Sequence, residues 1–169
     1  FVFFSLGLLS TSLENIKAAS DVVRDMIQPT PILESIFLSE RLGIPVYLKL
    51  ENLNITGSFK IRGATNAIRS LPKEKRAKGI VAASAGNHAQ AVAYVCRQLE
   101  IPCHIFMPEF TPLIKSSKTE QLGAQITLIG ETLDDAYESA LKYEQQTGAT
   151  MIHPFANPDV IAGQGTIGL

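Results

Sequence analysis

The sequence has few cysteines, no run of basic residues and no apolar stretch long enough to span a bilayer. Cys96 and Cys103 are its two thiols. They fall on a predicted helix and strand without metal-ligand spacing, so we expect reduced, buried packing residues and a cytoplasmic location. A formal net charge of -1 without a basic cluster argues against nucleic acid as a partner. The apolar segment 1–9 is too short for a membrane span and lacks the basic flank of a signal peptide.

The composition is that of a folded globular domain. The chain has 169 residues, of which 46% are hydrophobic and 18% charged. This is enough apolar material for one core, and too much for a disordered chain.

The residue pattern in the first half of the chain predicts three helices and a strand. Ser12 is placed to cap a helix whose apolar residues recur at helical spacing until Pro29 and Pro31 end it. A short helix ends at Gly43. A strand at 46–50, a helix from Ser58 to about Leu71 and a charged turn at 72–78 follow.

The second half alternates regularly between apolar runs and amphipathic segments. The runs are 80–83, 103–107, 125–129 and 150–152, and the segments between them are 88–99, 113–122 and 133–146. Gly79, Gly123 and Gly148 stand where the helices should stop. The pattern predicts an α/β fold with an open, mostly parallel sheet and flanking helices.

Lys60 is predicted to open a helix directly after a loop that contains Gly57. The positive end of the helix dipole and partial burial both disfavour the ammonium form, so the pKa of Lys60 should fall. A neutral amine near pH 7 suits a lysine that forms a Schiff base. The alternative is an ordinary solvated lysine in a first helical turn.

The loop Ser84–His88 joins a predicted strand to a predicted helix through small residues. Such a turn leaves free backbone N–H groups at the carboxyl edge of a parallel sheet, where an anion can bind. The alternative is an ordinary strand-to-helix turn of this fold. For His88 we expect a role in orienting the loop rather than in proton transfer, because the helix dipole disfavours its charged form.

The other titratable groups give no second site. His104 and His153 lie on or beside predicted strands and are expected to be packing residues. Glu131, Asp134 and Asp135 are expected to be first-turn charges of a helix, stabilised by its dipole. No group of His, Cys or carboxylate residues has metal-ligand spacing, so we expect no metal.

Two motifs carry a resemblance to a known family. Residues 58–64 (SFKIRGA) and 84–90 (SAGNHAQ) resemble the paired signature of the pyridoxal-phosphate-dependent threonine/serine dehydratases. The resemblance runs from about Leu13 to the last residue and includes 163–166 (GQGT). It implies the tryptophan-synthase-β type of fold, which is fold type II of the pyridoxal-phosphate enzymes.

The resemblance also implies the roles of individual residues. Lys60 holds pyridoxal 5'-phosphate covalently, and after release it removes the α-proton of the substrate. Phe59 and Asn87 contact the cofactor, and Asn87 hydrogen-bonds its phenolic oxygen. The loop Ser84, Ala85, Gly86, Asn87 and His88 binds the substrate carboxylate. The implied reaction converts L-threonine to 2-oxobutanoate and ammonia, or L-serine to pyruvate and ammonia.

Ala85 favours elimination over racemisation. Racemases of this family carry a serine at the corresponding position, whose hydroxyl returns a proton to the opposite face, and alanine has no proton to give. Two alternatives stay open: a serine-racemase-like enzyme, and a non-catalytic α/β module that binds an anion at the Ser84–His88 loop. The sequence does not rank threonine against serine, or isoleucine biosynthesis against threonine catabolism.

Catalytic domains of the family are about twice as long as this chain. The resemblance places a tetraglycine loop for the cofactor phosphate, and a partner for the pyridine nitrogen, beyond the point that corresponds to Leu169. We therefore expect residues 13–74 and 153–169 to be part of a large cofactor-binding domain, and 75–152 to form the small α/β domain. Residues 1–12 are expected to be extraneous or disordered.

We expect the fragment alone to be marginally stable and inactive. We expect the full-length protein to be a homo-oligomer, either a dimer or a tetramer.

Overall fold

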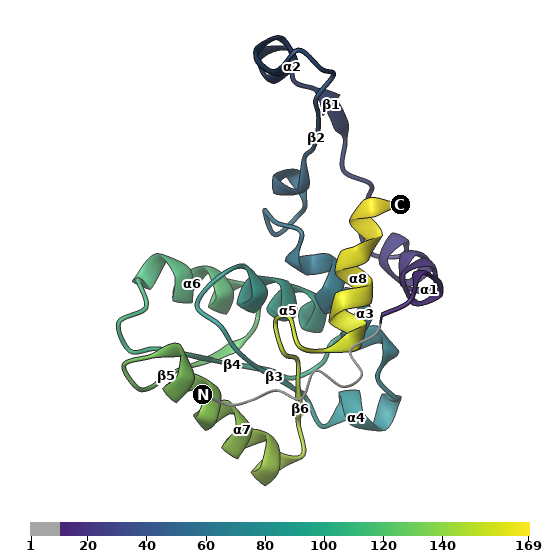
Figure 1. Cartoon of the computed structure of the whole chain (residues 1–169). Helices are drawn as coiled ribbons and strands as arrows, with labels where there is room; N and C mark the ends of the chain where they lie inside the picture. The colour runs from purple at the N-terminus through teal and green to yellow at the C-terminus, as the bar shows by residue number, and fades with distance from the viewer. Residues whose placement is uncertain (1–10) are drawn as a thin grey trace.

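The computed structural model describes residues 11–169 and shows a four-stranded sheet with helices on both faces, beside a group of three packed helices (Figure 1). The elements follow in the order α1 (Leu13–Arg24), β1 (Ile32–Glu34), α2 (Ile36–Leu42), β2 (Tyr47–Lys49), η1 (Glu51–Leu53), α3 (Lys60–Ser70), α4 (Lys73–Ala77), β3 (Ile80–Ala83), α5 (Asn87–Gln98), β4 (Cys103–Met107), α6 (Leu113–Gln121), β5 (Gln125–Leu128), α7 (Leu133–Thr147), β6 (Thr150–Met151), α8 (Pro158–Gly165) and η2 (Thr166–Gly168). The expectation for residues 1–12 lies outside the described residues, except at Thr11 and Ser12. Ser12 caps α1 as predicted, because its Oγ accepts a hydrogen bond from the N–H of Asn15 at 3.2 Å.

The predicted parallel sheet is confirmed. Its strands lie in the order β5-β4-β3-β6, and each neighbouring pair is parallel. Successive residues of β3 face opposite sides: Ile80 and Ala82 pack in the core with α5, whereas Val81 and Ala83 pack against α7. Because both faces are covered, all four residues of β3 are buried and apolar.

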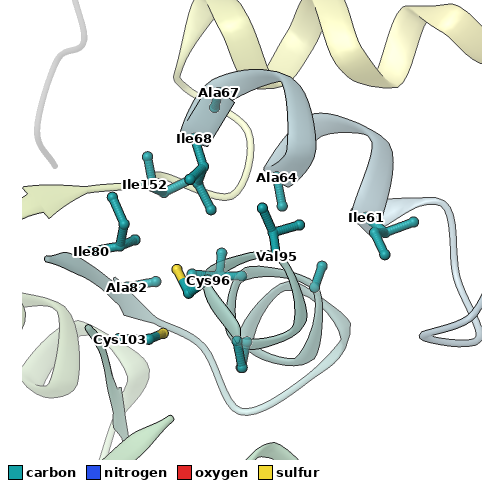
Figure 2. Packing of buried hydrophobic residues seen from close by; sticks show 14 of the residues in the cluster. Ile61, Ala64, Ala67, Ile68, Ile80, Ala82, Val95, Cys96, Cys103 and Ile152 are labelled. Carbon is teal, nitrogen blue, oxygen red and sulfur yellow. The ribbon is translucent and has the colours of Figure 1, made fainter. Parts of the chain in front are cut away.

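The main core lies between the sheet, α5 and α3 (Figure 2). Ile61 and Ile68 of α3 pack with Val95 and Cys96 of α5, and all four side chains are fully buried. Cys96 and Cys103 are buried free thiols, as expected from the sequence. A hydrogen bond with Cys103, together with burial, raises the pKa of Cys96, so this thiol is held in its unreactive form.

Several boundaries differ from the sequence prediction. Helix α1 ends at Arg24 rather than near Pro29, and the N–H of Met26 bonds to the carbonyl of Val23, three residues back instead of the four of an α-helix. The predicted charged turn 72–78 contains the short helix α4, whose first bonds are donated to the carbonyl of Pro72. The strand β1 and the helix α8 were not predicted at all.

The hairpin β1–β2 and the helix α2 project from the body as an arm (Figure 1). The two strands pair antiparallel, with Ile32 opposite Lys49, and no residue of β1 is buried. Large apolar side chains of the arm are exposed, among them Ile36 at 70% and Phe37 at 68%. Among residues 11–169, no helix combines the length and the apolar character that crossing a bilayer requires.

Candidate active site

Lys60 is the first residue of α3, as predicted. The residue is half-buried, and its Nζ donates a hydrogen bond to the carbonyl of Pro154 at 3.0 Å and lies 5.4 Å from the centre of the Phe59 ring. Desolvation lowers the pKa of Lys60, in the direction expected from the sequence. The amine is therefore easier to deprotonate than that of a surface lysine.

The loop Ser84–Gly86 connects β3 to α5, and Asn87 is the first residue of the helix. Gly86 is the N-cap and offers no side chain, so no capping side chain occupies the first turn of α5. A Cβ added to Gly86 would meet no atom within 4 Å, which shows open space in front of the loop. The hydroxyl of Ser84 accepts a hydrogen bond from the N–H of Gly86 at 3.2 Å, and Ala85 and Asn87 are at least partly exposed.

His88 is buried, and its Nε2 lies 2.8 Å from the carbonyl oxygen of Ile152. Because a carbonyl only accepts, Nε2 carries the proton and Nδ1 is a buried acceptor that has no partner within the described residues. Burial lowers the pKa of His88 to about 4. This arrangement favours the orienting role that we predicted for His88 over a role as a general base.

The segment 152–154, directly after β6, brings the two parts of the candidate site together. The carbonyl of Ile152 binds His88 in the first turn of α5, and the carbonyl of Pro154 binds Lys60 in the first turn of α3. Between them, His153 accepts hydrogen bonds at Nδ1 from the N–H groups of Phe155 at 3.2 Å and Ala156 at 2.9 Å. His153 therefore shapes the turn that carries these carbonyls, which is more than the packing role expected for it.

The remaining titratable residues lie away from this site. His104 stacks on Phe106 within β4 and bonds Thr127, in keeping with the packing role that we predicted. Asp135 forms a capping box with Thr132 at the start of α7, as expected for a first-turn charge. Within the part of the chain that the structure describes, no three His, Cys, Asp or Glu side chains are grouped as metal ligands.

Sequence reasoning missed the residues that hold the start of α3. Gln164 of α8 contacts the first turn of this helix, and the buried Arg62 forms an ion pair with the partly buried Glu51. The only sequence signal for Gln164 was its place in the motif 163–166, which was noted without a role. For the ion pair there was no signal, because a buried arginine cannot be told from an exposed one by spacing alone.

Comparisons with known proteins agree on one family. Residues 23–169 match the family described as pyridoxal-phosphate-dependent enzymes. An L-threonine ammonia-lyase from Thermotoga maritima is 52% identical over 158 residues, which is 94% of this chain and 39% of the relative. The chain thus spans about two fifths of the length of this curated relative.

Solved structures confirm the fold type II architecture expected from the resemblance. The processed form of threonine deaminase isoform 2 from Solanum lycopersicum has a TM-score of 0.87 and 42% identity, covering 92% of this chain and 42% of its own. A serine racemase from Dictyostelium discoideum has a TM-score of 0.87 and 39% identity, covering 93% and 51%. With a lysine at the head of α3, an open helix terminus beside it and these matches, the chain belongs to the family of pyridoxal-phosphate-dependent enzymes.

Proposed function

We propose that the full-length protein is an L-threonine ammonia-lyase that also acts on L-serine. The observation that carries this proposal is the desolvated amine of Lys60, linked through residues 152–154 to the open end of α5. Two similar relatives that are named L-threonine ammonia-lyase support the reaction class. The chain spans about two fifths of the length of these relatives, so the proposal concerns a protein of their full length.

The residues present fit pyridoxal phosphate. Lys60 is half-buried, and within residues 11–169 its amine donates a hydrogen bond to a backbone carbonyl alone, so a carbonyl compound can displace that contact and bond Nζ. Phe59 is 41% exposed beside it and offers an apolar surface to a planar ring. Asn87 is exposed at the start of α5 and supplies an amide for the phenolic oxygen. We assign Lys60, Phe59 and Asn87 to cofactor binding.

In the proposed reaction, pyridoxal phosphate supplies the electron sink that makes the α-proton of an amino acid acidic. The backbone N–H groups at Ser84–His88 hold the substrate carboxylate, aided by the positive end of α5. Lys60, in its neutral form, accepts the α-proton at Nζ. The β-hydroxyl leaves as water, and in the overall balance its proton is the α-proton that Lys60 removed. The enamine that remains is hydrolysed to 2-oxobutanoate and ammonia when the substrate is threonine.

Serine racemisation is the second candidate, because two solved structures with a similar fold are serine racemases. Elimination is favoured because Ala85 has no hydroxyl that can return a proton to the opposite face of the substrate carbon. A non-catalytic anion-binding module is the third reading, and in that case Lys60 would act through its charge alone.

We also propose the division into a small domain, 75–152, and a part of the large domain, 13–74 with 153–169. The parallel sheet with α5, α6 and α7 lies within the first range, and the packed helices α1, α3 and α8 lie within the second. Assembly of the full-length protein into a dimer or tetramer belongs to the same proposal.

Borohydride reduction tests the function. The full-length protein is incubated with pyridoxal phosphate and reduced, and its peptides are mapped by mass spectrometry. We expect a pyridoxyl group on Lys60, and formation of 2-oxobutanoate from L-threonine that the substitution Lys60→Ala abolishes. Absence of the adduct would exclude the enzyme, and exchange between serine enantiomers faster than keto-acid formation would favour the racemase.

A further inference from the structure

The motif 163–166 has no role in the function proposed above, yet it lies against the first turn of α3. Gly163 and Gly63 let the backbones of α8 and α3 touch. A Cβ at Gly163 would lie 2.6 Å from the carbonyl oxygen of Arg62 and 2.7 Å from the Cα of Gly63, too close for any side chain. This close approach brings the next residue, Gln164, to the start of the helix that carries Lys60.

The side-chain amide of Gln164 bonds the backbone of α3 at two points. Its Oε1 accepts from the N–H of Gly63 at 3.2 Å, and its Nε2 donates to the carbonyl of Lys60 at 3.4 Å. Only one orientation of the amide satisfies both contacts. Phe59, the N-cap of α3, gives no side-chain hydrogen bond. Ser58 Oγ accepts a hydrogen bond from the N–H of Lys60 at 3.4 Å, and Gln164 adds two bonds to the same turn from another helix.

Lys60 is thus held at both ends by the segment that follows β6. Gln164 bonds its backbone carbonyl, and Pro154 accepts from its Nζ at 3.0 Å. Thr166, in the same motif, accepts from Nη1 of Arg62 at 3.3 Å and so gives the first turn of α3 another contact with this segment. These contacts fix the backbone position from which the Lys60 side chain starts and the direction in which its amine points.

We infer that Gln164 is a positioning residue for Lys60, because it fixes the first turn of α3 from which the amine reaches the cofactor. This inference rests on the proposed function in one respect, namely the reactive role of Lys60. Displacement of a reacting group by about 1 Å can lower a rate about 100-fold. The competing explanation is that Gln164 only stabilises the fold.

Three variants of the full-length protein separate these explanations. Gln164→Ala removes both contacts with α3. Gln164→Glu keeps an acceptor for Gly63 and places a negative charge at a helix start, which favours stability, but it loses the donor to Lys60. The matched control is Asn66→Ala, since Asn66 also joins α3 to α8, through a 2.8 Å hydrogen bond to the carbonyl of Asp159, without touching Lys60.

The main measurement is the rate of pyridoxal phosphate capture at Lys60, trapped with borohydride and read by peptide mapping well below each unfolding temperature. We expect capture to slow about tenfold or more in Gln164→Ala and Gln164→Glu and to stay within about twofold of wild type in Asn66→Ala. The unfolding temperature should fall in both alanine variants and be retained in Gln164→Glu. Capture rates that follow the unfolding temperature across all three variants would overturn the inference.

A second measurement does not depend on the cofactor. Reductive methylation with formaldehyde compares Lys60 with the exposed Lys73 in the same protein. A ratio that changes severalfold in both Gln164 variants and not in Asn66→Ala supports the positioning role, and an unchanged ratio contradicts it. If wild-type protein captures no pyridoxal phosphate, the proposed function fails, and the methylation ratio still decides the inference.

Discussion

Arg62, which is buried, and Glu51, which is partly buried, form a bidentate ion pair next to the candidate site. Nε of Arg62 lies 2.7 Å from Oε2 of Glu51, and Nη2 lies 2.8 Å from Oε1. Thr30 and Asn54 donate further hydrogen bonds to the same carboxylate, each at 2.6 Å. Arg62 stands two residues after Lys60 in α3. Its ion pair therefore ties the start of α3 to the loops on either side of the hairpin β1–β2.

Breaking this pair should destabilise the protein strongly. Glu51→Gln leaves the guanidinium of Arg62, 7% exposed, without its counterion, so we expect the free energy of unfolding to fall by about 3–5 kcal/mol. Urea denaturation of the full-length protein measures it. The control is Asp25→Asn at the other end of α3, where the ion pair with Arg69 is exposed and should contribute less than about 1 kcal/mol. Equal effects of the two substitutions would contradict the argument.

His88 should make stability depend on pH. Its pKa is lowered from 6.5 to about 4 by burial, so between these values the unfolded chain binds a proton that the folded chain does not. The contribution of His88 to the free energy of unfolding is complete above pH 6.5 and is lost as the pH falls toward 4. One pKa unit corresponds to about 1.4 kcal/mol, so the loss amounts to about 3 kcal/mol.

The comparison protein for this prediction is His88→Gln, which has no titrating group and keeps a donor for the carbonyl of Ile152. Urea denaturation of both proteins from pH 7 to 4.5 isolates His88 from His104 and His153, whose pKa values burial also lowers. Parallel stability curves for wild type and variant would show that His88 is not the responsible group.

Ala85→Ser should change the outcome of the reaction. The new hydroxyl gives the loop a proton donor, and a placed general acid typically accelerates a proton transfer by about 100-fold or more. We expect the full-length variant to racemise L-serine at least about tenfold faster than wild type, measured by chiral chromatography with keto-acid formation followed in parallel. Ala83→Ser, at a buried position in β3, is the control that should not gain this activity.

Gly163→Ala should separate α8 from α3. The added methyl group would meet the carbonyl of Arg62 at 2.6 Å, and overpacking of this kind costs about 1–3 kcal/mol. Calorimetric unfolding measures the loss. Gly168→Ala is the control, because a Cβ there meets no atom within 4 Å. A Gly163 variant as stable as the Gly168 variant would show that the helices are not in backbone contact.

Residues 11–169 expressed alone should self-associate. The arm exposes Ile36, Phe37 and other apolar side chains, and a two-stranded hairpin is marginal in water. Sedimentation velocity should therefore show concentration-dependent oligomers, with broad thermal unfolding. A soluble monomer with one sharp transition would contradict the expectation of marginal stability.

The local features of this protein were predictable because they depend on near neighbours in the chain. The apolar runs at 80–83 and 103–107 are the strands β3 and β4 over the same residues, since a strand buried on both faces must be apolar throughout. The start of α3 at Lys60 agrees with the sequence prediction, and the paired motifs indicated the family that the comparisons confirmed. The short helix α4 was not predicted, because five residues hold too little periodicity.

By itself, the sequence determined the α/β alternation, the lysine at a helix start and the open turn at Ser84–His88. Only the tertiary structure decided which residues hold that lysine. Pro154 and Gln164 are 94 and 104 residues from Lys60, and Gln164 reaches it because α8 crosses α3 at two glycines. Periodicity reports which face of a helix is buried, whereas the partner of a particular polar atom depends on how distant segments close upon one another.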